Sequence, residues 1–188
     1  MNTPAHLLIG AAVVGRRQPR LIGWALLGAL LPDLSLYVLG GVSLFLLRIP
    51  PQVVFDELYF SPAWQTVFAI DNSVIVWGIA LALAVWARKT GAIALCTAAL
   101  LHIALDFPLH AGDGRPHFWP VSAWVYDSPF SYWDRSHGAA TFAPIEALFS
   151  ALAAMWLWQV QGLVRWGAVA LLSAELWVVR QWLFVFGQ

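Results

Sequence analysis

The chain has 188 residues, of which 61% are hydrophobic and 11% are charged, and its formal net charge is zero. A soluble domain averages roughly 45–50% apolar and about 25% charged residues, so this composition excludes an ordinary soluble protein and indicates an integral membrane protein. The balanced charge gives no indication of a nucleic-acid partner, and membrane lipids are the expected surroundings. We predict a single integral membrane domain over residues 1–188. The sequence identifies no protein partner.

Seven apolar runs follow one another along the chain. The first three are too short to span a bilayer as separate helices, since a spanning helix needs about 20 residues, so we expect half-spanning, tilted or re-entrant pieces there. Pro32 is predicted to separate the second run from the third. The runs are 5–15, 21–31, 34–47, 63–87, 91–107, 145–162 and 166–186. This pattern predicts an all-α polytopic membrane protein with about five to six transmembrane or half-spanning helices and a long outer loop over residues 108–144.

Basic residues mark one side of the expected membrane. They occur at three junctions between apolar runs, and none of these junctions contains Asp or Glu. The residues are Arg16, Arg17 and Arg20 in the first junction, Arg88 and Lys89 in the second, and Arg165 in the third. Because cytoplasmic loops carry an excess of Lys and Arg, these junctions are expected in the cytoplasm. The polar connectors 50–62 and 108–144 then face the outside, provided that the second and third runs cross the membrane only once.

Ionisable residues converge at one depth in this arrangement. Counted from the nearest basic junction at about 1.5 Å per helical residue, they lie about 15 to 28 Å up, in the outer half of a hydrocarbon core about 30 Å thick. Charged groups inside a bilayer are costly and mark functional sites, and a bound cation would neutralise several carboxylates at once. The converging residues are His6, Asp33, Asp71, His102, Asp106 and Glu146.

The most specific local pattern is LHIALDFPLH over residues 101–110. His102 and Asp106 are four residues apart, so they point from one face of a helix and can offer two ligands to one metal. Pro108 ends the helix, after which His110 can fold back, and His117 follows as a further ligand. Imidazole and carboxylate ligands suit a divalent metal, zinc foremost, with manganese or iron as alternatives. A buried His–Asp hydrogen bond that fixes helix packing is the structural alternative.

Two further ligands are expected in the first two runs. His6 follows Thr3-Pro4-Ala5, which is typical of a helix start, and Asp33 follows a proline that would direct its carboxylate inward. An interfacial histidine and a plain helix cap are the respective alternatives. Asp71 belongs to a polar triplet inside an apolar run, where it is either a general base or a polar contact between helices.

The outer loop supplies the remaining candidates. Asp134 is a second candidate general base, and Arg115 and Arg135 are candidates for binding a substrate anion. Solvated surface charge is the alternative for all three. Residues that could complete the site or orient its ligands are Asp113, His137 and Glu146. Glu146 could instead complement a helix dipole.

The segments 3–10 and 27–33, together with His102 and Asp106, resemble the membrane-bound metal-dependent hydrolases, which include the bacterial inner-membrane hydrolase described as LexA-binding. The outer-loop stretches 109–120 and 131–137 are similar to one subgroup of these proteins. This family usually has an acid where Ser35 stands and often a histidine near the place of residues 71–73. A more distant resemblance is to the zinc-dependent phospholipase C and single-strand nuclease superfamily. This second resemblance implies hydrolysis, in a superfamily that acts on phosphoesters, without fixing the substrate. The first resemblance implies a bacterial inner membrane, and the basic junctions then predict that the site faces the periplasm.

The leading hypothesis is therefore a membrane-embedded metal-dependent hydrolase that acts on a phosphoester or lipid-related substrate. A non-enzymatic protein that binds or transports a metal ion or protons is one rival, because a chain of carboxylates and histidines also suits that role. A structural subunit of a membrane complex is another. Glu175 and Arg180, five residues apart in the final run, are expected to form a structural pair.

Overall fold

The computed structural model describes residues 1–15 and 17–184. It is 73% helical and has no strand within these ranges, which confirms the predicted all-α class. Three described stretches, Pro19–Leu46, Pro62–Trp86 and Ala139–Trp158, are helices long and apolar enough to cross a membrane, and Thr3–Gly15 and Thr90–Asp106 are shorter apolar helices. The α-helices are α1 (Thr3–Gly10), α2 (Ile22–Gly41), α3 (Pro51–Val53), α4 (Pro62–Asp71), α5 (Val74–Trp86), α6 (Thr90–Asp106), α7 (Ala139–Trp158) and α8 (Leu163–Phe184).

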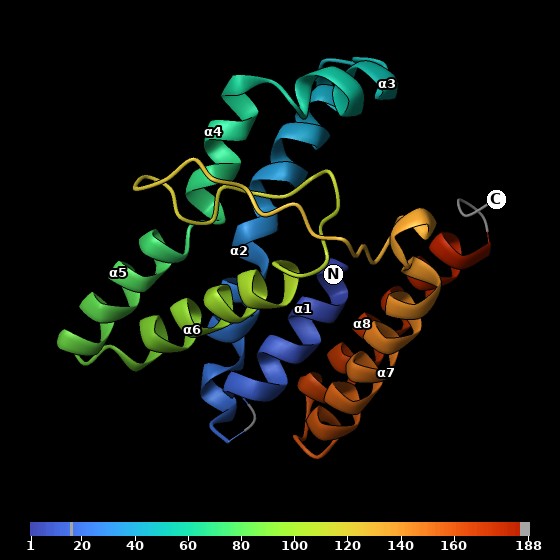
Figure 1. Ribbon diagram of the computed structural model, residues 1–188. Helices are drawn as coiled ribbons and strands as arrows, with labels where there is room; N and C mark the ends of the chain where they lie inside the picture. The colour runs from blue at the N-terminus through green and yellow to red at the C-terminus, as the bar shows by residue number, and fades with distance from the viewer. Residues whose placement is uncertain (16, 185–188) are drawn as a thin grey trace.

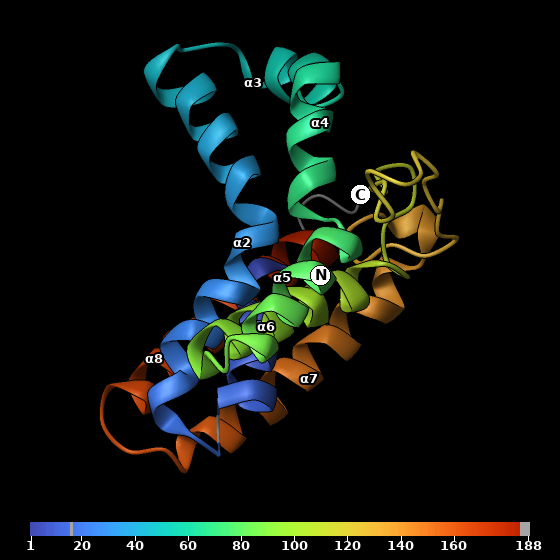
Figure 2. The ribbon, with the colours of Figure 1, turned by 90° about the vertical axis from the view of Figure 1, so that its left-hand side faces the viewer.

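Helix α1 lies between α6 on one side and α7 and α8 on the other (Figures 1 and 2). Its first turn contains Pro4, and the fixed φ and missing N–H of proline suit that position. The helix packs against α2, α6, α7 and α8, and Ala5 and Leu8 are completely buried by these contacts. A polar side chain on α1 is therefore brought against several other helices at once.

Small residues allow α2 to approach its neighbours closely. Gly28 lies against the backbone of Leu95 on α6, and a Cβ atom there would collide with the Leu95 carbonyl. Gly10 on α1 faces the methyl group of Ala29 on α2. Small residues at such interfaces are the usual means of close helix packing in membranes. This packing brings the middle of α2 within reach of side chains on α6.

The prediction that Pro32 breaks the second helix is wrong. Helix α2 runs through Pro32 without interruption, and helical turns continue over Val42–Leu46. A proline leaves carbonyls one turn earlier without their usual donor, and membrane helices tolerate this where neighbouring helices supply replacement bonds. The carbonyl that loses its donor here is that of Gly28, and His102 on α6 bonds to the next carbonyl, with its Nδ1 2.7 Å from the Ala29 oxygen. The second and third runs thus form one continuous helix.

The fourth apolar run, predicted as one helix over 63–87, is divided into α4 and α5. The break falls at Asn72 and Ser73, where the Ser73 hydroxyl accepts hydrogen bonds from the Ile75 and Val76 amides at 3.2 and 3.1 Å and so caps α5. The Asn72 amide donates to the Pro32 carbonyl oxygen at 3.2 Å and ties the break to α2. Helices α4 and α5 point in different directions from this break (Figures 1 and 2).

The outer loop is shorter than predicted. Helix α7 begins at Ala139, directly after Gly138 in the left-handed conformation, so Pro144 and the five residues before it are helical. Figure 1 shows the connections α1–α2, α5–α6 and α7–α8 toward one side of the molecule, and the α2–α4 connector and the outer loop toward the other. The described residues of the three basic junctions therefore share a side of the molecule, as the charge pattern predicts. Arg16, in the first junction, lies outside the described residues.

Candidate metal centre

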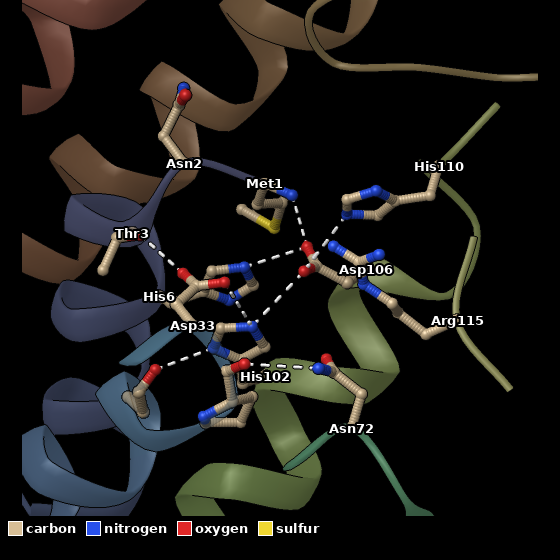
Figure 3. Close-up of polar contacts among 12 residues, drawn as sticks. Met1, Asn2, Thr3, His6, Asp33, Asn72, His102, Asp106, His110 and Arg115 are labelled. Atoms are coloured by element: carbon tan, nitrogen blue, oxygen red, sulfur yellow. Dashed lines mark hydrogen bonds and ion pairs between the residues drawn. The ribbon is translucent and has the colours of Figure 1, made fainter. Parts of the chain in front are cut away.

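Helices α1, α2 and α6 meet around a buried group of imidazoles and carboxylates (Figure 3). His6 comes from α1, Asp33 from α2, and His102 and Asp106 from α6. The two imidazoles are 1% exposed, and their rings stack with centroids 3.6 Å apart. The sequence analysis predicted these four residues as ligands, and the structure brings all four together.

Asp106 is the hub of this group. Its Oδ1 lies 2.9 Å from Nε2 of His6, and its Oδ2 lies 3.3 Å from Nε2 of His102 and 3.3 Å from Nε2 of His110. The amino group of Met1 also contacts Oδ1. One carboxylate thus faces three imidazoles and an ammonium group.

The orientation of His102 suits metal binding. Its Nδ1 donates to the Ala29 carbonyl, and this bond fixes the tautomer in which Nε2 carries the lone pair. Nε2 then points at the carboxylates, 3.6 Å from Oδ1 of Asp33. Among the described residues, this Nε2 atom and Nδ1 of His6 are buried without a hydrogen-bond partner. A buried nitrogen with a lone pair and no donor is suited to coordinate a cation.

The donor set also fits a metal by its chemistry and spacing. His6, His102 and Asp106 each offer one ligand atom, and these atoms all lie within 4.8 Å of one another. Two imidazoles and a carboxylate are a ligand set that zinc takes in catalytic sites, where a fourth position stays open. Asp33 stands at the edge of the set, held by a 2.5 Å hydrogen bond from the Thr3 hydroxyl, and can extend it.

The start of the outer loop brings a second polar layer over the centre. His110 lies between Asp106 and Asp113, with its Nδ1 3.1 Å from Oδ1 of Asp113. Burial opposes a charge on His110, but these two carboxylates outweigh it and raise the pKa of the imidazole from 6.5 to about 9. Without a metal, His110 is therefore an imidazolium at neutral pH. Tyr132 packs edge-on against this ring, with centroids 5.5 Å apart.

His117 lies farther along the loop and is held differently. Its Nδ1 donates to the carbonyl oxygen of Asn72 at 2.9 Å, and burial lowers the pKa of its imidazole. The ring is therefore neutral near pH 7, and its Nε2 is an acceptor. The structure places His117 in the wall of the cavity above the centre and outside the group that meets at Asp106.

A polar cavity of about 260 Å³ adjoins the centre. Its lining includes Asp33, Asp106 and His110, so these three candidate ligands face open space, whereas His6 and His102 lie behind them and are not among the described residues of the lining. Arg115 also lines it, with its guanidinium group 4.3 Å from the Phe68 ring centroid and a 2.6 Å hydrogen bond to the Tyr59 hydroxyl. A fixed cation in this wall can bind an anionic group, as predicted for Arg115.

Several predicted site residues lie away from this cavity. Asp71 ends α4, where its backbone carbonyl accepts a 2.7 Å bond from the Trp77 indole, and it is not among the described residues that line the cavity. Asp134 and His137 instead pair with each other at 2.7 Å in the exposed part of the loop. Arg135 lies beside them and is exposed. The structure therefore separates these four residues from the centre.

Glu146 belongs to a second buried cluster. Its Oε1 accepts a bond from the backbone amide of Asn2 at 2.5 Å, whereas its Oε2 is buried without a hydrogen-bond partner among the described residues, as is Oε2 of Glu175 on α8. Glu175 is completely buried and accepts from the Asn2 side-chain amide at 3.3 Å. The predicted pairing of Glu175 with Arg180 is wrong, because Arg180 lies over the Trp177 ring instead.

Sequence reasoning missed several residues of the centre. Tyr59, Asn72 and Tyr132 line the cavity, and Thr3 holds Asp33. Burial and the nearby carboxylates raise the pKa of Tyr132 well above 10, so it remains a phenol and a donor. Three of them had a local signal, because Thr3 and Tyr132 lie within the stretches 3–10 and 131–137 that carry the family resemblance and Asn72 belongs to the polar triplet 71–73, whereas Tyr59 had none. Comparisons with models of protein families, with curated proteins and with solved structures found no match.

Proposed function

We propose that this protein is a membrane-embedded metal-dependent hydrolase that acts on a phosphoester or lipid-related substrate at the outer face of a bacterial inner membrane. The proposal rests mainly on one observation: His6, His102 and Asp106 are buried close together, with one ligand atom of each within 4.8 Å of the others, beside the polar cavity. These three residues would hold a divalent metal, zinc foremost, with Asp33 and His110 at its edges. The metal would lower the pKa of a bound water and polarise a phosphoryl or acyl oxygen.

The remaining residues of the cavity have roles that follow from their contacts. Arg115 would bind the anionic group of the substrate, because its guanidinium is fixed in the cavity wall by Tyr59 and Phe68. Asp113 lines the cavity and contacts His110, so we assign the general base to Asp113 in place of Asp71 and Asp134. Tyr132 would donate a hydrogen bond to a developing negative charge.

Metal content and hydrolysis of the purified protein test this proposal. Wild-type protein is expected to contain stoichiometric metal and to hydrolyse bis-p-nitrophenyl phosphate. His102→Ala is expected to lose both, because it removes the nitrogen that lies between Asp33 and Asp106. If this variant does not fold, His102→Asn provides a second test, since its amide can replace Nδ1 as donor to Ala29 but cannot replace Nε2.

The matched control is Ile103→Ala, at the neighbouring buried position of α6. This variant removes a side chain that is as deeply buried as His102 but offers no ligand atom. Its metal content should therefore stay at the wild-type value. A wild-type preparation without stoichiometric metal would contradict the metal centre. Metal bound without hydrolysis of any phosphoester or lipid substrate would instead favour an ion-binding protein.

A further inference from the structure

A second, larger hollow lies beside the polar cavity. It is a groove of about 800 Å³ between α1, the end of α6 and the outward face of α7. Its lining is almost entirely apolar and includes Ile9, Val13, Leu105, Phe142, Phe149 and Trp156. Phe149 is 54% exposed, so the groove is open to the surroundings. On a membrane-spanning helix such as α7, those surroundings are lipid chains.

The groove and the polar cavity share a wall. Met1 lines both of them, and its amino group contacts Asp106 of the candidate centre. Pro108 and Leu109 also line the groove, directly before His110 in the chain. The upper end of the groove therefore adjoins the candidate ligands, and Figure 1 shows the N-terminus at this point, between the ends of α6 and α7.

The length of the groove matches one lipid chain. On α7 its lining extends from Phe142 to Trp156, which is about 21 Å along a helix. At the other wall it extends from Met1, just before α1, to Val13 in the helical turns that follow α1, and the helical stretch from Thr3 to Val13 is about 15 Å long. Half of a hydrocarbon core about 30 Å thick is about 15 Å, so either wall can accompany one acyl chain from the headgroup level to the middle of the bilayer.

We propose that this groove binds an acyl chain of the substrate, a phospholipid whose phosphate lies in the polar cavity near Arg115. The inference rests on the proposed hydrolase function and gives it a substrate class. An apolar groove that faces hydrocarbon is filled by lipid chains, because water is not available there. A chain in this groove emerges at Met1, beside the centre, so the groove places the head of the lipid against the candidate ligands.

A substitution that fills the groove tests this. Ala104 is exposed on α6 and lines the groove, and Ala104→Phe would displace the chain. We expect kcat/KM for phosphatidylglycerol in mixed micelles to fall about tenfold or more, since a misplacement of one ångström can cost about 100-fold. Hydrolysis of bis-p-nitrophenyl phosphate, which has no acyl chain, should stay within about twofold. The control Ala82→Phe, at an exposed position of α5, should leave both rates unchanged. Equal losses on both substrates would overturn the proposal.

A binding experiment separates failure of the groove from failure of the hydrolase function. Phosphatidylglycerol with a diazirine near the end of one chain is photolysed with the wild-type protein in nanodiscs, and the labelled residues are identified by mass spectrometry. The groove predicts labels concentrated on the α7 face that contains Phe149, and loss of these labels in Ala104→Phe. Labels spread evenly over α5 and α7 would overturn the groove, whether or not any substrate is hydrolysed. Labels in the groove without hydrolysis would uphold the lipid site and reject the hydrolase.

Discussion

Two buried polar clusters meet at the first residues of the chain, and they balance their charges differently. The centre between α1, α2 and α6 combines His6, His102 and Asp106, whereas the cluster between α1, α7 and α8 joins Glu146 and Glu175 through Asn2. The centre contains imidazole nitrogens that have no hydrogen-bond partner in the described part of the chain. In the second cluster, Oε2 of Glu146 and Oε2 of Glu175 also lack a hydrogen-bond partner among the described residues, but no described imidazole stands beside them. The proposed metal site therefore rests on the imidazole nitrogens beside Asp106 and not on buried carboxylates alone.

Neutralising one carboxylate in each cluster gives the largest expected contrast. Asp106→Asn removes the charge that faces three imidazoles and should eliminate stoichiometric metal, with hydrolysis reduced by more than about 100-fold, beyond the range for residues that only support a ligand. Glu175→Gln should retain full metal content, since Glu175 contributes no atom to the ligand set of His6, His102 and Asp106. The free energy of unfolding of this variant should differ from the wild-type value by no more than about 1 kcal/mol, which is the net contribution of one hydrogen bond.

Metal analysis and thermal unfolding of both variants in the same detergent provide the measurement. Glu146→Gln serves as a further control, since it neutralises the partner of Glu175 and leaves Asp106 intact. Loss of metal from Glu175→Gln comparable to that from Asp106→Asn would show that the two clusters form one site. The contrast between them would then be wrong.

The close packing of α2 on α6 provides a second, smaller test. Gly28→Ala would place a methyl group against the Leu95 backbone, and separating these helices moves Asp33 away from His102. Overpacking costs about 1–3 kcal/mol, so we expect a comparable loss of stability and metal affinity lowered by about tenfold. Gly23→Ala, on the same helix, meets no described atom within 4 Å and should gain up to about 1 kcal/mol from helix propensity. Equal stabilities of the two variants would show that the interface has room.

The helical class and the basic junctions could be predicted from the sequence, because hydrophobicity and charge act locally along the chain. The prediction failed where a distant partner decides the local structure. Pro32 lies inside α2, and His102 and Asn72, both from later segments, bond to the carbonyls of Ala29 and Pro32 around it. The break at Ser73 could have been foreseen from its capping hydroxyl, but the apolar residues on both sides concealed it.

The centre could be predicted in part for a similar reason. His6, Asp33, His102 and Asp106 are polar residues in apolar helices, and counting residues from the basic ends places them at a common depth. Counting residues along a helix gives the depth of a side chain in the membrane, but not the direction in which it points from the helix axis. The count therefore could not distinguish Asp33, which lines the cavity, from Asp71, which ends α4 away from it. The residue count places Asp134 and His137 in the outer loop, but no long helix predicts where a loop side chain points. In the structure these two residues pair with each other and do not reach the centre.

The smallest expected effect concerns His110, the loop histidine above the centre. Its pKa is raised to about 9 from 6.5, so in metal-free protein the imidazolium stabilises the fold below pH 6.5, and this stabilisation is lost as the pH rises through 9. A metal ligand must be neutral, so metal affinity should change in the opposite sense and rise by up to about tenfold per pH unit between 7 and 9. Thermal unfolding without metal and metal titration over this range measure the two trends. His110→Asn should flatten both, while retaining His6, His102 and Asp106. A metal affinity that is independent of pH in the wild type would place His110 outside the ligand set and confine the centre to the three helical residues.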